Sequence, residues 1–269
     1  MQKRSDQNFK GIDVSHWQGE IQWEKVKNAG MSFVYIKATE GTSVTDPCFS
    51  QNVKGAKQAG LMVGAYHFGR FKDGEKAEKE ANHFAQIVKP FSLDLPPVLD
   101  IETNQGLSKK DLSSAALVFR QRLKSQLSAD CMLYTSTHFA KEHLDLTVKK
   151  LPVWIAHYGV LTPKENGIWE NWDVFQFSDQ GTVPGIKGNV DLNEWDRTRG
   201  EAFFAAKSTT IQREAPIQNH TAHLIIKKGD TFWDLETKNG WSHGTLTKLN
   251  PGIDPRKLQI GQKISCPHN

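Results

Sequence analysis

Apolar and polar positions follow two alternating kinds of spacing along the first 200 residues. Short runs of apolar and β-branched residues, bounded by turn residues, are typical of strands. The strands that these runs predict span residues 9–14, 33–39, 61–68, 97–102, 131–135, 153–156, 173–177 and 189–192. Apolar residues at helical spacing predict helices over residues 23–28, 47–59, 75–88 and 111–127.

This alternation of strands with helices and loops predicts parallel β/α units and an α/β fold class. Eight such strands within residues 1–204 favour a closed β/α barrel over an open sheet. Residues 162–171 contain Pro163 and Gly167 and predict a loop, so we expect the barrel to be irregular.

The last quarter of the chain has a different pattern. Residues 205–221 are mostly polar and lack periodicity, which predicts a linker. Residues 222–269 then predict a small βααβ module, with Thr231 capping its first helix and Gly240 ending it. A unit of this size suits an appended binding domain.

Composition and charge narrow the classes of partner. The 269 residues are 38% hydrophobic, which is enough for a substantial core, and the formal net charge is +4. The excess of positive charge lies at the C-terminal end, where residues 222–269 hold 7 basic and 4 acidic side chains. A weakly basic module suits an anionic surface such as a cell wall. Without a dense Lys/Arg stripe, we expect no nucleic acid partner.

Cysteine and histidine positions predict no metal or other cofactor. Cys48, Cys131 and Cys266 are widely spaced, so we expect reduced thiols and no structural zinc. His16, His67 and His157 also lack the spacing of metal ligands. No apolar run is long enough for membrane insertion, and no apolar segment near the N-terminus predicts a signal peptide.

The pair Asp100 and Glu102 carries the most specific chemistry in the chain. On a strand over residues 97–102 the two side chains share one face, with Cα atoms about 6.5–7 Å apart. Two acids at a buried strand end can share one proton, as acid/base chemistry at an acetal oxygen requires. The alternative is a strand that ends in two solvated acids.

Other reactive side chains also fall at predicted strand ends, where barrel enzymes build their active sites. They are Asp13, Lys37, Tyr66, Asp100, Glu102, Tyr134, Trp154, Gln176 and Asp191. We therefore expect the four acids among them to converge in one bowl. Asp13 could instead stabilise the barrel end by pairing with Lys37 or His67, and Trp154 could serve in core packing.

Six motifs within residues 1–203 resemble the family 25 glycoside hydrolases, the lysozymes of the Chalaropsis type. In chain order they are Gly11-Ile12-Asp13-Val14-Ser15, Phe33-Val34-Tyr35-Ile36-Lys37-Ala38-Thr39-Glu40-Gly41, Gly64-Ala65-Tyr66-His67-Phe68, Leu99-Asp100-Ile101-Glu102, Trp154-Ile155-Ala156-His157-Tyr158 and Val190-Asp191-Leu192-Asn193. The resemblance implies a flattened, irregular TIM-like barrel. It also implies hydrolysis of the β-1,4 bond between N-acetylmuramic acid and N-acetylglucosamine in peptidoglycan.

The same resemblance implies roles for individual residues. Glu102 corresponds to the general acid, and Asp13, Asp100 and Asp191 to supporting acids. The expected substrate-binding residues are Tyr35, Lys37, Tyr66, Tyr134, Trp154, Tyr158 and Gln176.

The C-terminal module resembles a LysM domain, through residues 226–233, 246–253 and 258–264. This implies binding of N-acetylglucosamine-containing glycans in a groove between two loops. The loop residues are Gly229, Asp230, Thr231, Phe232, Asn250, Pro251, Gly252 and Ile253. Asp234 and Glu236 depart from the family pattern, which usually has smaller or apolar residues there.

Two mechanisms remain open for Asp100. It is either a direct nucleophile or the group that orients the N-acetyl oxygen of the substrate, which then attacks to form an oxazolinium-like intermediate. The N-acetyl group of the substrate favours the second mechanism, with net retention. In either case Glu102 needs a raised pKa, and we expect repulsion by three nearby carboxylates to raise it.

We expect a protein of this kind to be made in the cytoplasm and to act on the bacterial wall after release, as a phage endolysin or a bacterial autolysin. The rival functions are a non-catalytic wall-binding protein and a chitinase-like N-acetylglucosaminidase.

Overall fold

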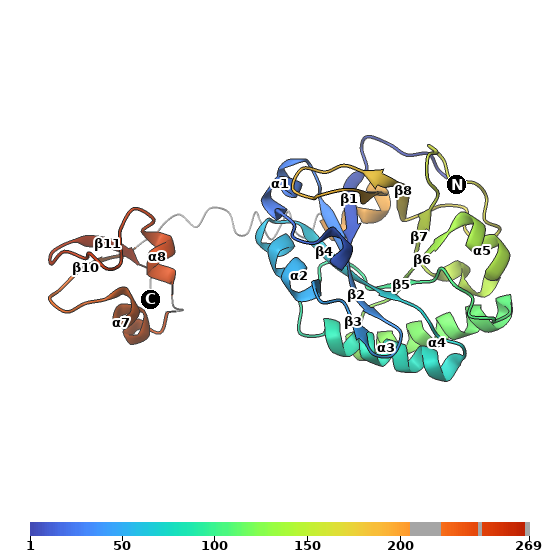
Figure 1. Cartoon of the computed structure of the whole chain (residues 1–269), viewed down its shortest axis with the longest axis horizontal. Helices are drawn as coiled ribbons and strands as arrows, with labels where there is room; N and C mark the ends of the chain where they lie inside the picture. The colour runs from blue at the N-terminus through green and yellow to red at the C-terminus, as the bar shows by residue number, and fades with distance from the viewer. Residues whose placement is uncertain (205–221, 242–243, 267–269) are drawn as a thin grey trace. The chain divides into compact units, whose positions relative to one another are not determined.

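The computed structural model describes residues 1–204, 222–241 and 244–266, and it divides the chain into two compact units, Met1–Ala206 and Lys207–Asn269 (Figure 1). The predicted linker, residues 205–221, lies outside the described residues.

The first unit is a closed barrel of eight strands with one extra hairpin strand. Its sheet order is β1-β9-β8-β7-β6-β5-β4-β2-β3, and pairing between β1 and β2 closes the barrel. The strands are β1 (Phe9–Val14), β2 (Phe33–Glu40), β3 (Val44–Thr45), β4 (Met62–Phe68), β5 (Val98–Asp100), β6 (Met132–Ser136), β7 (Val153–Ala156), β8 (Val174–Gly181) and β9 (Val190–Trp195). This confirms the predicted α/β barrel, and only the short β3 was not predicted.

The last barrel strand runs against its neighbours, which corrects the prediction of a fully parallel barrel. β9 pairs antiparallel with both β8 and β1, because a loop without a crossover helix joins β8 to β9. The N-terminal end of β9 therefore lies at the barrel end where the other strands have their C-terminal ends.

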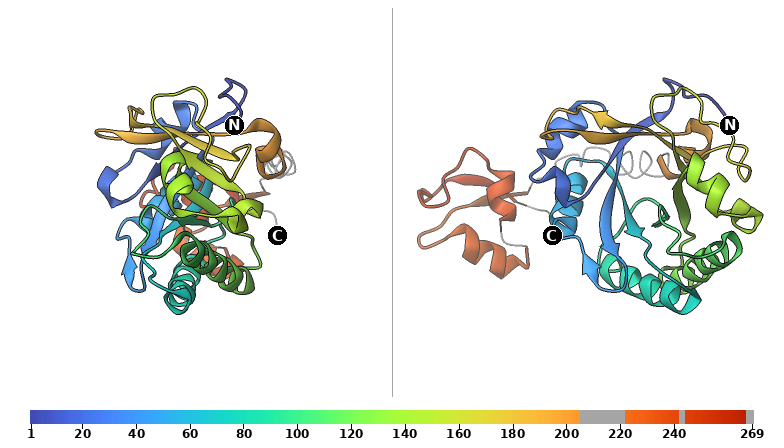
Figure 2. Two further views of the ribbon diagram at one scale, coloured as in Figure 1. Left: turned by 90° about the vertical axis from the view of Figure 1, so that its right-hand side faces the viewer. Right: turned by 45° about the vertical axis from the view of Figure 1, so that its right-hand side comes forward.

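Helices cover the outside of the barrel unevenly (Figure 2). They are α1 (Trp23–Asn28), α2 (Phe49–Gln58), α3 (Gly74–Val88), α4 (Lys109–Leu127) and the unpredicted α5 (Thr137–His143), with 3-10 helices at His16–Gln18 and Leu146–Lys150. Asp73 and Ser108 cap α3 and α4 by accepting a backbone N–H three residues on. No helix joins β7 to β8, so the barrel is irregular where residues 162–171 predicted a loop.

Strand alternation divides the apolar side chains of this unit between two layers. Along β2, Val34 and Ile36 face outward under the helices, whereas Phe33 and Tyr35 fill the barrel interior. The interior is crowded with aromatic rings, and two glycines make room for them. A Cβ at Gly11 would lie 2.4 Å from the Phe33 ring, and one at Gly64 would lie 2.2 Å from the Tyr35 ring.

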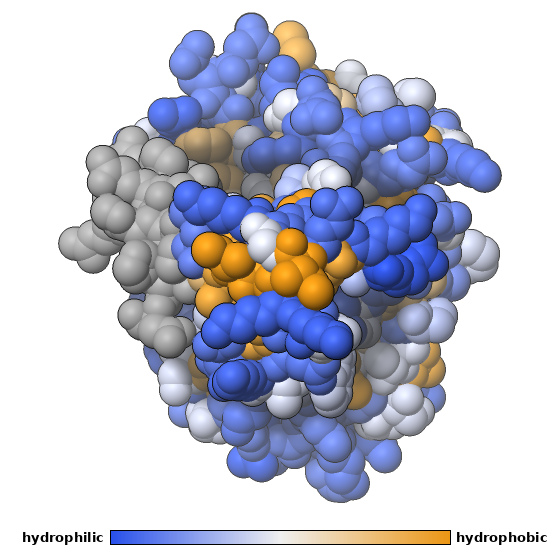
Figure 3. All heavy atoms as spheres, turned by 90° about the vertical axis from the view of Figure 1, so that its left-hand side faces the viewer, coloured by the Kyte–Doolittle hydropathy of each residue, from blue (hydrophilic) through white to orange (hydrophobic). Residues whose placement is uncertain are grey.

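The second unit has the predicted βααβ order. Its elements are β10 (Ala222–Ile225), α7 (Phe232–Asn239), α8 (Thr245–Leu249) and β11 (Lys263–Cys266), with β10 and β11 antiparallel. Its core contains Ile226, Phe232, Leu246 and Ile264. Figure 3 shows an apolar patch on this unit, framed by hydrophilic side chains.

Glu236, one of the two departures from the LysM pattern, has a structural role. Its side chain is buried, and its carboxylate accepts hydrogen bonds from the backbone N–H groups of Gly244 at 2.9 Å and Leu246 at 2.7 Å. The acid therefore caps the start of α8 from the middle of α7.

Candidate active site

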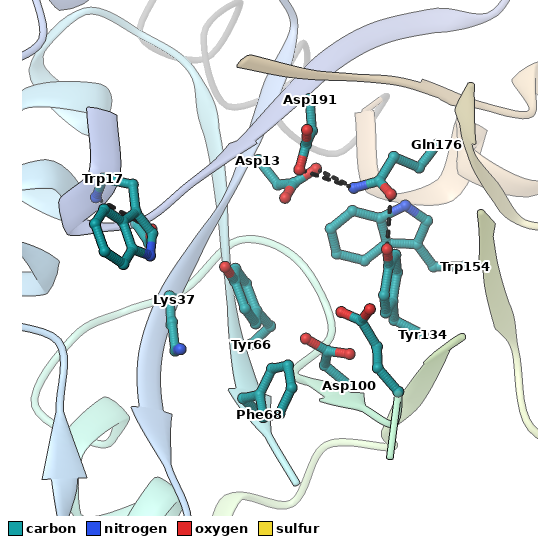
Figure 4. Close-up of a pocket in the computed structure, with 12 residues that line it drawn as sticks. Asp13, Trp17, Lys37, Tyr66, Phe68, Asp100, Tyr134, Trp154, Gln176 and Asp191 are labelled. Atoms are coloured by element: carbon teal, nitrogen blue, oxygen red, sulfur yellow. Dashed lines mark hydrogen bonds between the residues drawn. The ribbon is translucent and has the colours of Figure 1, made fainter. Parts of the chain in front are cut away.

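A pocket of about 180 Å³ opens at the barrel end where β1 and β4–β8 have their C-terminal ends (Figure 4). It is lined by Asp13, Ser15, Trp17, Lys37, Tyr66, Phe68, Asp100, Glu102, Tyr134, Trp154, Gln176 and Asp191. The structure thus brings together all four predicted acids and most of the predicted substrate-binding residues. The predicted acidic bowl is confirmed as an arrangement of side chains.

Strand ends position these acids. Asp13 on β1 is the direct register partner of Asp191 on β9. Asp191 lies at the start of its strand, where the sequence predicted an end, yet it reaches the pocket because β9 is antiparallel. Asp100 is the last residue of β5.

Glu102 lies beyond β5, which corrects the predicted strand over residues 97–102. Side chains nevertheless continue to alternate between the outer face of the barrel and its interior past the end of the strand. Ile101 is buried on the outer face and its N–H donates to the Tyr134 carbonyl at 3.0 Å, so Glu102 returns to the pocket side.

Burial dominates the electrostatics of the Asp100–Glu102 pair. Asp100 is 4% exposed, and desolvation raises its pKa well above the usual value, with the Glu102 charge adding to the shift. Glu102 reaches solvent in the pocket, but partial desolvation of its carboxyl also raises its pKa. The predicted cause, repulsion by three carboxylates, is wrong, because burial is the largest cause and Lys37 and Arg70 act in the opposite direction.

One oxygen of Asp100 is an acceptor without a donor. Oδ1 is buried and receives no hydrogen bond from the part of the chain that the structure describes. Such an atom is costly in a folded protein unless a ligand or water satisfies it. The wall of the pocket therefore contains a buried acceptor at the end of β5.

Asp13 is held by two side-chain amides. Its Oδ2 accepts hydrogen bonds from Gln176 Nε2 and Asn193 Nδ2, both at 2.8 Å. Burial and the nearby Asp191 raise the pKa of Asp13 well above its usual value, and burial raises the pKa of Asp191 to about 6. The two carboxyls therefore titrate as a pair rather than independently.

The alternative role of Asp13, pairing with Lys37 or His67, is wrong. Lys37 Nζ donates to Glu40 Oε2 at 2.6 Å. His67 faces outward from β4, is fully buried, and its Nε2 lies 2.9 Å from Glu80 Oε2.

Tyr35 is not at the pocket, which corrects its prediction as a substrate-binding residue. It faces the barrel interior like Lys37 but lies two residues deeper along β2, where it is fully buried. Its hydroxyl donates to the Pro96 carbonyl at 3.1 Å.

Trp154 packs in the barrel core, which was the alternative left open for it. It is 2% exposed, stacks on Tyr35 with ring centroids 4.9 Å apart, and donates through Nε1 to Asn193 Oδ1 at 2.8 Å. It also lines the pocket, so its position is mainly that of a core residue at the pocket floor.

Tyr134 and Tyr158 both donate to Gln176 Oε1, at 2.7 and 2.8 Å. Tyr134 lines the pocket, whereas Tyr158 is 45% exposed and is not among the lining residues. Tyr66 lines the pocket as predicted, and burial raises the pKa of its hydroxyl well above the usual value.

Sequence reasoning missed Trp17, which is 81% exposed at the pocket edge. The short helix that carries it is fixed by a capping box between Ser15 and Gln18, and by contacts between His16 and Asp46. An exposed indole beside a polar pocket is the kind of surface on which sugar rings stack. The signal in the sequence was an aromatic residue three positions beyond Val14, the last residue of β1.

Two predicted glycan-binding residues of the second unit are structural, which corrects those predictions. Phe232 is 4% exposed and packs in the small core. Asn250 is buried, and its side-chain NH₂ donates to the carbonyls of Leu246 and Ser265, while its Oδ1 accepts from the Ser265 N–H. The remaining predicted loop residues keep some exposure: Gly229, Asp230, Thr231, Pro251, Gly252 and Ile253.

Replacing Asp191 with asparagine is expected to stabilise the protein at neutral pH. Because its folded pKa of about 6 exceeds the ordinary value of 3.8, the folded state holds more protons and loses stability as pH rises through that window. The variant avoids this loss, so its Tm should exceed that of the parent by a few degrees at pH 7 and match it near pH 3.5.

Asp130 provides a matched control of opposite sign for this thermal unfolding series. Arg120 lowers its pKa to about 2, so Asp130→Asn should lower Tm at pH 7 and have little effect near pH 2. A lower Tm for Asp191→Asn at pH 7 would contradict the assigned burial cost.

No described helix combines the length and the apolar character needed to cross a bilayer. In residues 1–204, 222–241 and 244–266, no group of three or more His, Cys, Asp or Glu side chains is arranged to hold a metal ion.

Comparison with known proteins gives two family matches. Residues 12–186 match the model of the glycosyl hydrolases family 25, and residues 224–267 match that of the LysM domain. Lysozyme M1 of Streptomyces globisporus is 38% identical over 211 residues, covering 74% of this chain and 71% of the relative. The N,O-diacetylmuramidase of Chalaropsis sp. is 29% identical over 203 residues, covering 67% and 95%.

Among solved structures, the bacterial lysozyme of Streptomyces coelicolor superposes with a TM-score of 0.69 at 36% identity. The match covers 76% of this chain and 100% of that structure.

Proposed function

The chain belongs to the glycosyl hydrolases family 25, and from this premise we propose that Glu102 and Asp100 carry out its hydrolysis of bacterial peptidoglycan. It is a glycoside hydrolase of the lysozyme type with a LysM domain for wall binding. The bond cleaved is the β-1,4 link between N-acetylmuramic acid and N-acetylglucosamine. The observation that carries the assignment of roles is the acid pair at the end of β5, because both of its side chains line the pocket.

Glu102 is the general acid. It reaches the solvent-filled part of the pocket, where a glycosidic oxygen has access to its carboxyl. Its raised pKa increases the protonated fraction near neutral pH, which a proton donor to the leaving oxygen needs.

Asp100 orients the acetamido group of the substrate. Its carboxylate lines the pocket and is suited to accept the acetamido N–H, which turns the carbonyl oxygen of that group toward the anomeric carbon. As the glycosidic bond breaks, that oxygen bonds to the anomeric carbon, and an ionised Asp100 stabilises the positive charge of the cyclic intermediate. Water then opens the intermediate, so the product keeps the configuration of the substrate.

This reaction assigns the remaining pocket residues to supporting roles. Asp191 lies across the pocket from Asp100, beside Asp13, and as an anion it accepts a proton or hydrogen bond from the sugar or from the attacking water. Lys37 and Tyr66 are polar wall groups, and Trp17 supplies an aromatic surface for a neighbouring sugar ring.

A non-catalytic wall protein is the alternative from a different class. Release of reducing ends from purified peptidoglycan by the full chain separates the two functions. Binding to the wall without any release would overturn the hydrolase assignment, whereas a steady release supports it.

We also propose that the protein is made in the cytoplasm and reaches the wall only after release. The second unit then tethers it there, through the exposed loop residues at 229–231 and 251–253. Fractionation of producing cells before and after lysis tests this localisation.

Removing residues 205–269 is expected to weaken sedimentation with intact walls about tenfold or more, because two linked modules bind a polymer more tightly than one. Cleavage of short soluble fragments should stay within about twofold, since all pocket residues lie within residues 1–204. A wall pull-down and a soluble-substrate assay on the same preparations measure both. Equal wall binding by the shortened chain would show that the barrel does its own targeting.

A further inference from the structure

Hydrogen bonds fix the orientation of the Gln176 side chain at the pocket floor. Its Oε1 accepts from the hydroxyls of Tyr134 and Tyr158, at 2.7 and 2.8 Å. A phenol donates readily to an amide oxygen, so the NH₂ group must point the other way. It donates to Oδ2 of Asp13 at 2.8 Å and to Oδ2 of Asp191 at 3.4 Å (Figure 4).

Asn193 on β9 is fixed in the same manner. An indole N–H is a donor only, and Nε1 of Trp154 donates to Asn193 Oδ1 at 2.8 Å. The amide therefore presents its NH₂ group to Asp13, where Nδ2 lies 2.8 Å from Oδ2. Asn193, Gln176 and Trp154 are each 2% exposed or less, so water does not compete for these bonds.

Both amides thus converge on one oxygen of Asp13. An oxygen that accepts two N–H groups is a poor place for a proton, so a proton on this carboxyl sits on Oδ1. Burial raises the pKa of Asp13 well above its usual value, and that of the less buried Asp191 only to about 6. A single proton held by the pair therefore favours Asp13, the more buried of the two carboxyls.

We propose that Asn193 and Gln176 are positioning residues for this aspartate pair. By occupying Oδ2 of Asp13, they keep the shared proton on Oδ1, from which it is donated to Asp191. Asp191 thereby stays an anion in the pocket while its neighbour is neutral. The inference rests on the proposed function, because it assumes that catalysis needs Asp191 ionised.

Several other titratable groups face the pair. The carboxyls are Asp179 on β8, Asp100 at the end of β5 and Glu102 just beyond it, and the hydroxyls are those of Tyr66 on β4, Tyr134 on β6 and Tyr158 after β7. The acidic neighbours oppose ionisation of Asp191, whereas the proton donated by Asp13 and the weaker N–H bond from Gln176 favour it.

The test is the pH profile of kcat/KM for Asn193→Leu and Asn193→Asp. Leucine removes the N–H donor without adding charge, and aspartate keeps an acceptor for Trp154 but cannot donate while it is ionised. In both variants Oδ2 of Asp13 keeps only the N–H bond from Gln176, so the proton can move to it. Asp191 then loses its donor and its pKa rises, so the acid limb of the profile should shift about one pH unit upward.

Asn166→Leu is the matched control, because Asn166 is an equally buried amide outside the pocket that binds two backbone N–H groups. It should lower Tm without moving the acid limb. A limb that stays in place in a folded Asn193→Leu, or that moves only in Asn193→Asp, would overturn the proposal. In that case hydrolysis by the unaltered enzyme and its dependence on Glu102 would still stand. Failure of the positioning proposal is therefore distinguishable from failure of the proposed function.

Asn193→Ala repeats the test with a smaller apolar side chain if Asn193→Leu does not fold. If neither folds, ¹³C carboxyl titration of the full chain labelled at aspartate decides. One pocket carboxyl that stays protonated through neutral pH, with a partner that titrates near pH 6, supports the proposal. Two carboxyls that both ionise below pH 5 contradict it.

Discussion

Glu102→Gln is expected to lower kcat on peptidoglycan by about 10²–10⁴-fold, the usual contribution of a general acid. Glutamine has nearly the same shape as glutamate, but its amide has no proton that can be transferred to a leaving alkoxide. Because Glu102 is exposed beyond the end of β5, the variant should keep its fold, and KM should change little. Steady-state release of reducing ends, with Tm as the fold check, measures all three quantities.

Glu142→Gln is the matched control, since Glu142 is an exposed glutamate of α5 outside the pocket. It should retain the parent rate. If Glu102→Gln also retained a rate within about threefold of the parent, the assignment of the general acid would be wrong.

Asp100→Asn is expected to reduce kcat by about 10²–10³-fold, the scale seen when one preorganised electrostatic contact to a transition state is lost. Asparagine fits the same space but carries no negative charge to stabilise the cyclic intermediate. The variant should also be more stable than the parent at neutral pH. The reason is that burial raises the pKa of Asp100, so ionising it costs stability as pH rises above the ordinary carboxyl value.

Walls whose amino sugars have been N-deacetylated distinguish the two mechanisms open for Asp100. If the acetamido oxygen attacks, the parent enzyme should lose a similar factor on these walls, and Asp100→Asn should add little to that loss. If Asp100 itself attacks, the parent should still cleave them, and mass spectrometry of rapidly quenched reactions should detect a glycosyl adduct on Asp100. That adduct would contradict substrate assistance.

The sequence predicts most of the barrel because strand alternation is set by local burial. Along β2, residues 33–39 alternate between the helix-facing layer and the interior, and this pattern is readable without a structure. Depth along the barrel axis is not readable in this way. Tyr35 and Lys37 share a face, but only the second reaches the pocket, because closure of the barrel covers the first with Trp154.

Strand direction was the second quantity that local pattern could not supply. Asp191 was correctly predicted at the pocket, although the predicted parallel strand would have carried it there by its other end. The antiparallel course of β9 depends on the loop after β8. That loop contains no helix, and its residues show no helical spacing in the sequence.

Roles that depend on distant partners were the least predictable. Asn193 stands in the Val-Asp-Leu-Asn motif, but its function depends on Trp154, 39 positions away, and on Asp13, 180 positions away. Glu236 was read as a departure from a binding pattern, whereas its partners Gly244 and Leu246 make it a helix cap.

The most direct test of the central claim is the identity of the sugar at the new reducing end after digestion of purified peptidoglycan. The products are reduced with borohydride and examined by mass spectrometry, with Glu102→Gln as the control. We predict N-acetylmuramitol at every new end from the parent enzyme and essentially none from the variant. N-acetylglucosaminitol at those ends would contradict the account, because it would make the enzyme an N-acetylglucosaminidase.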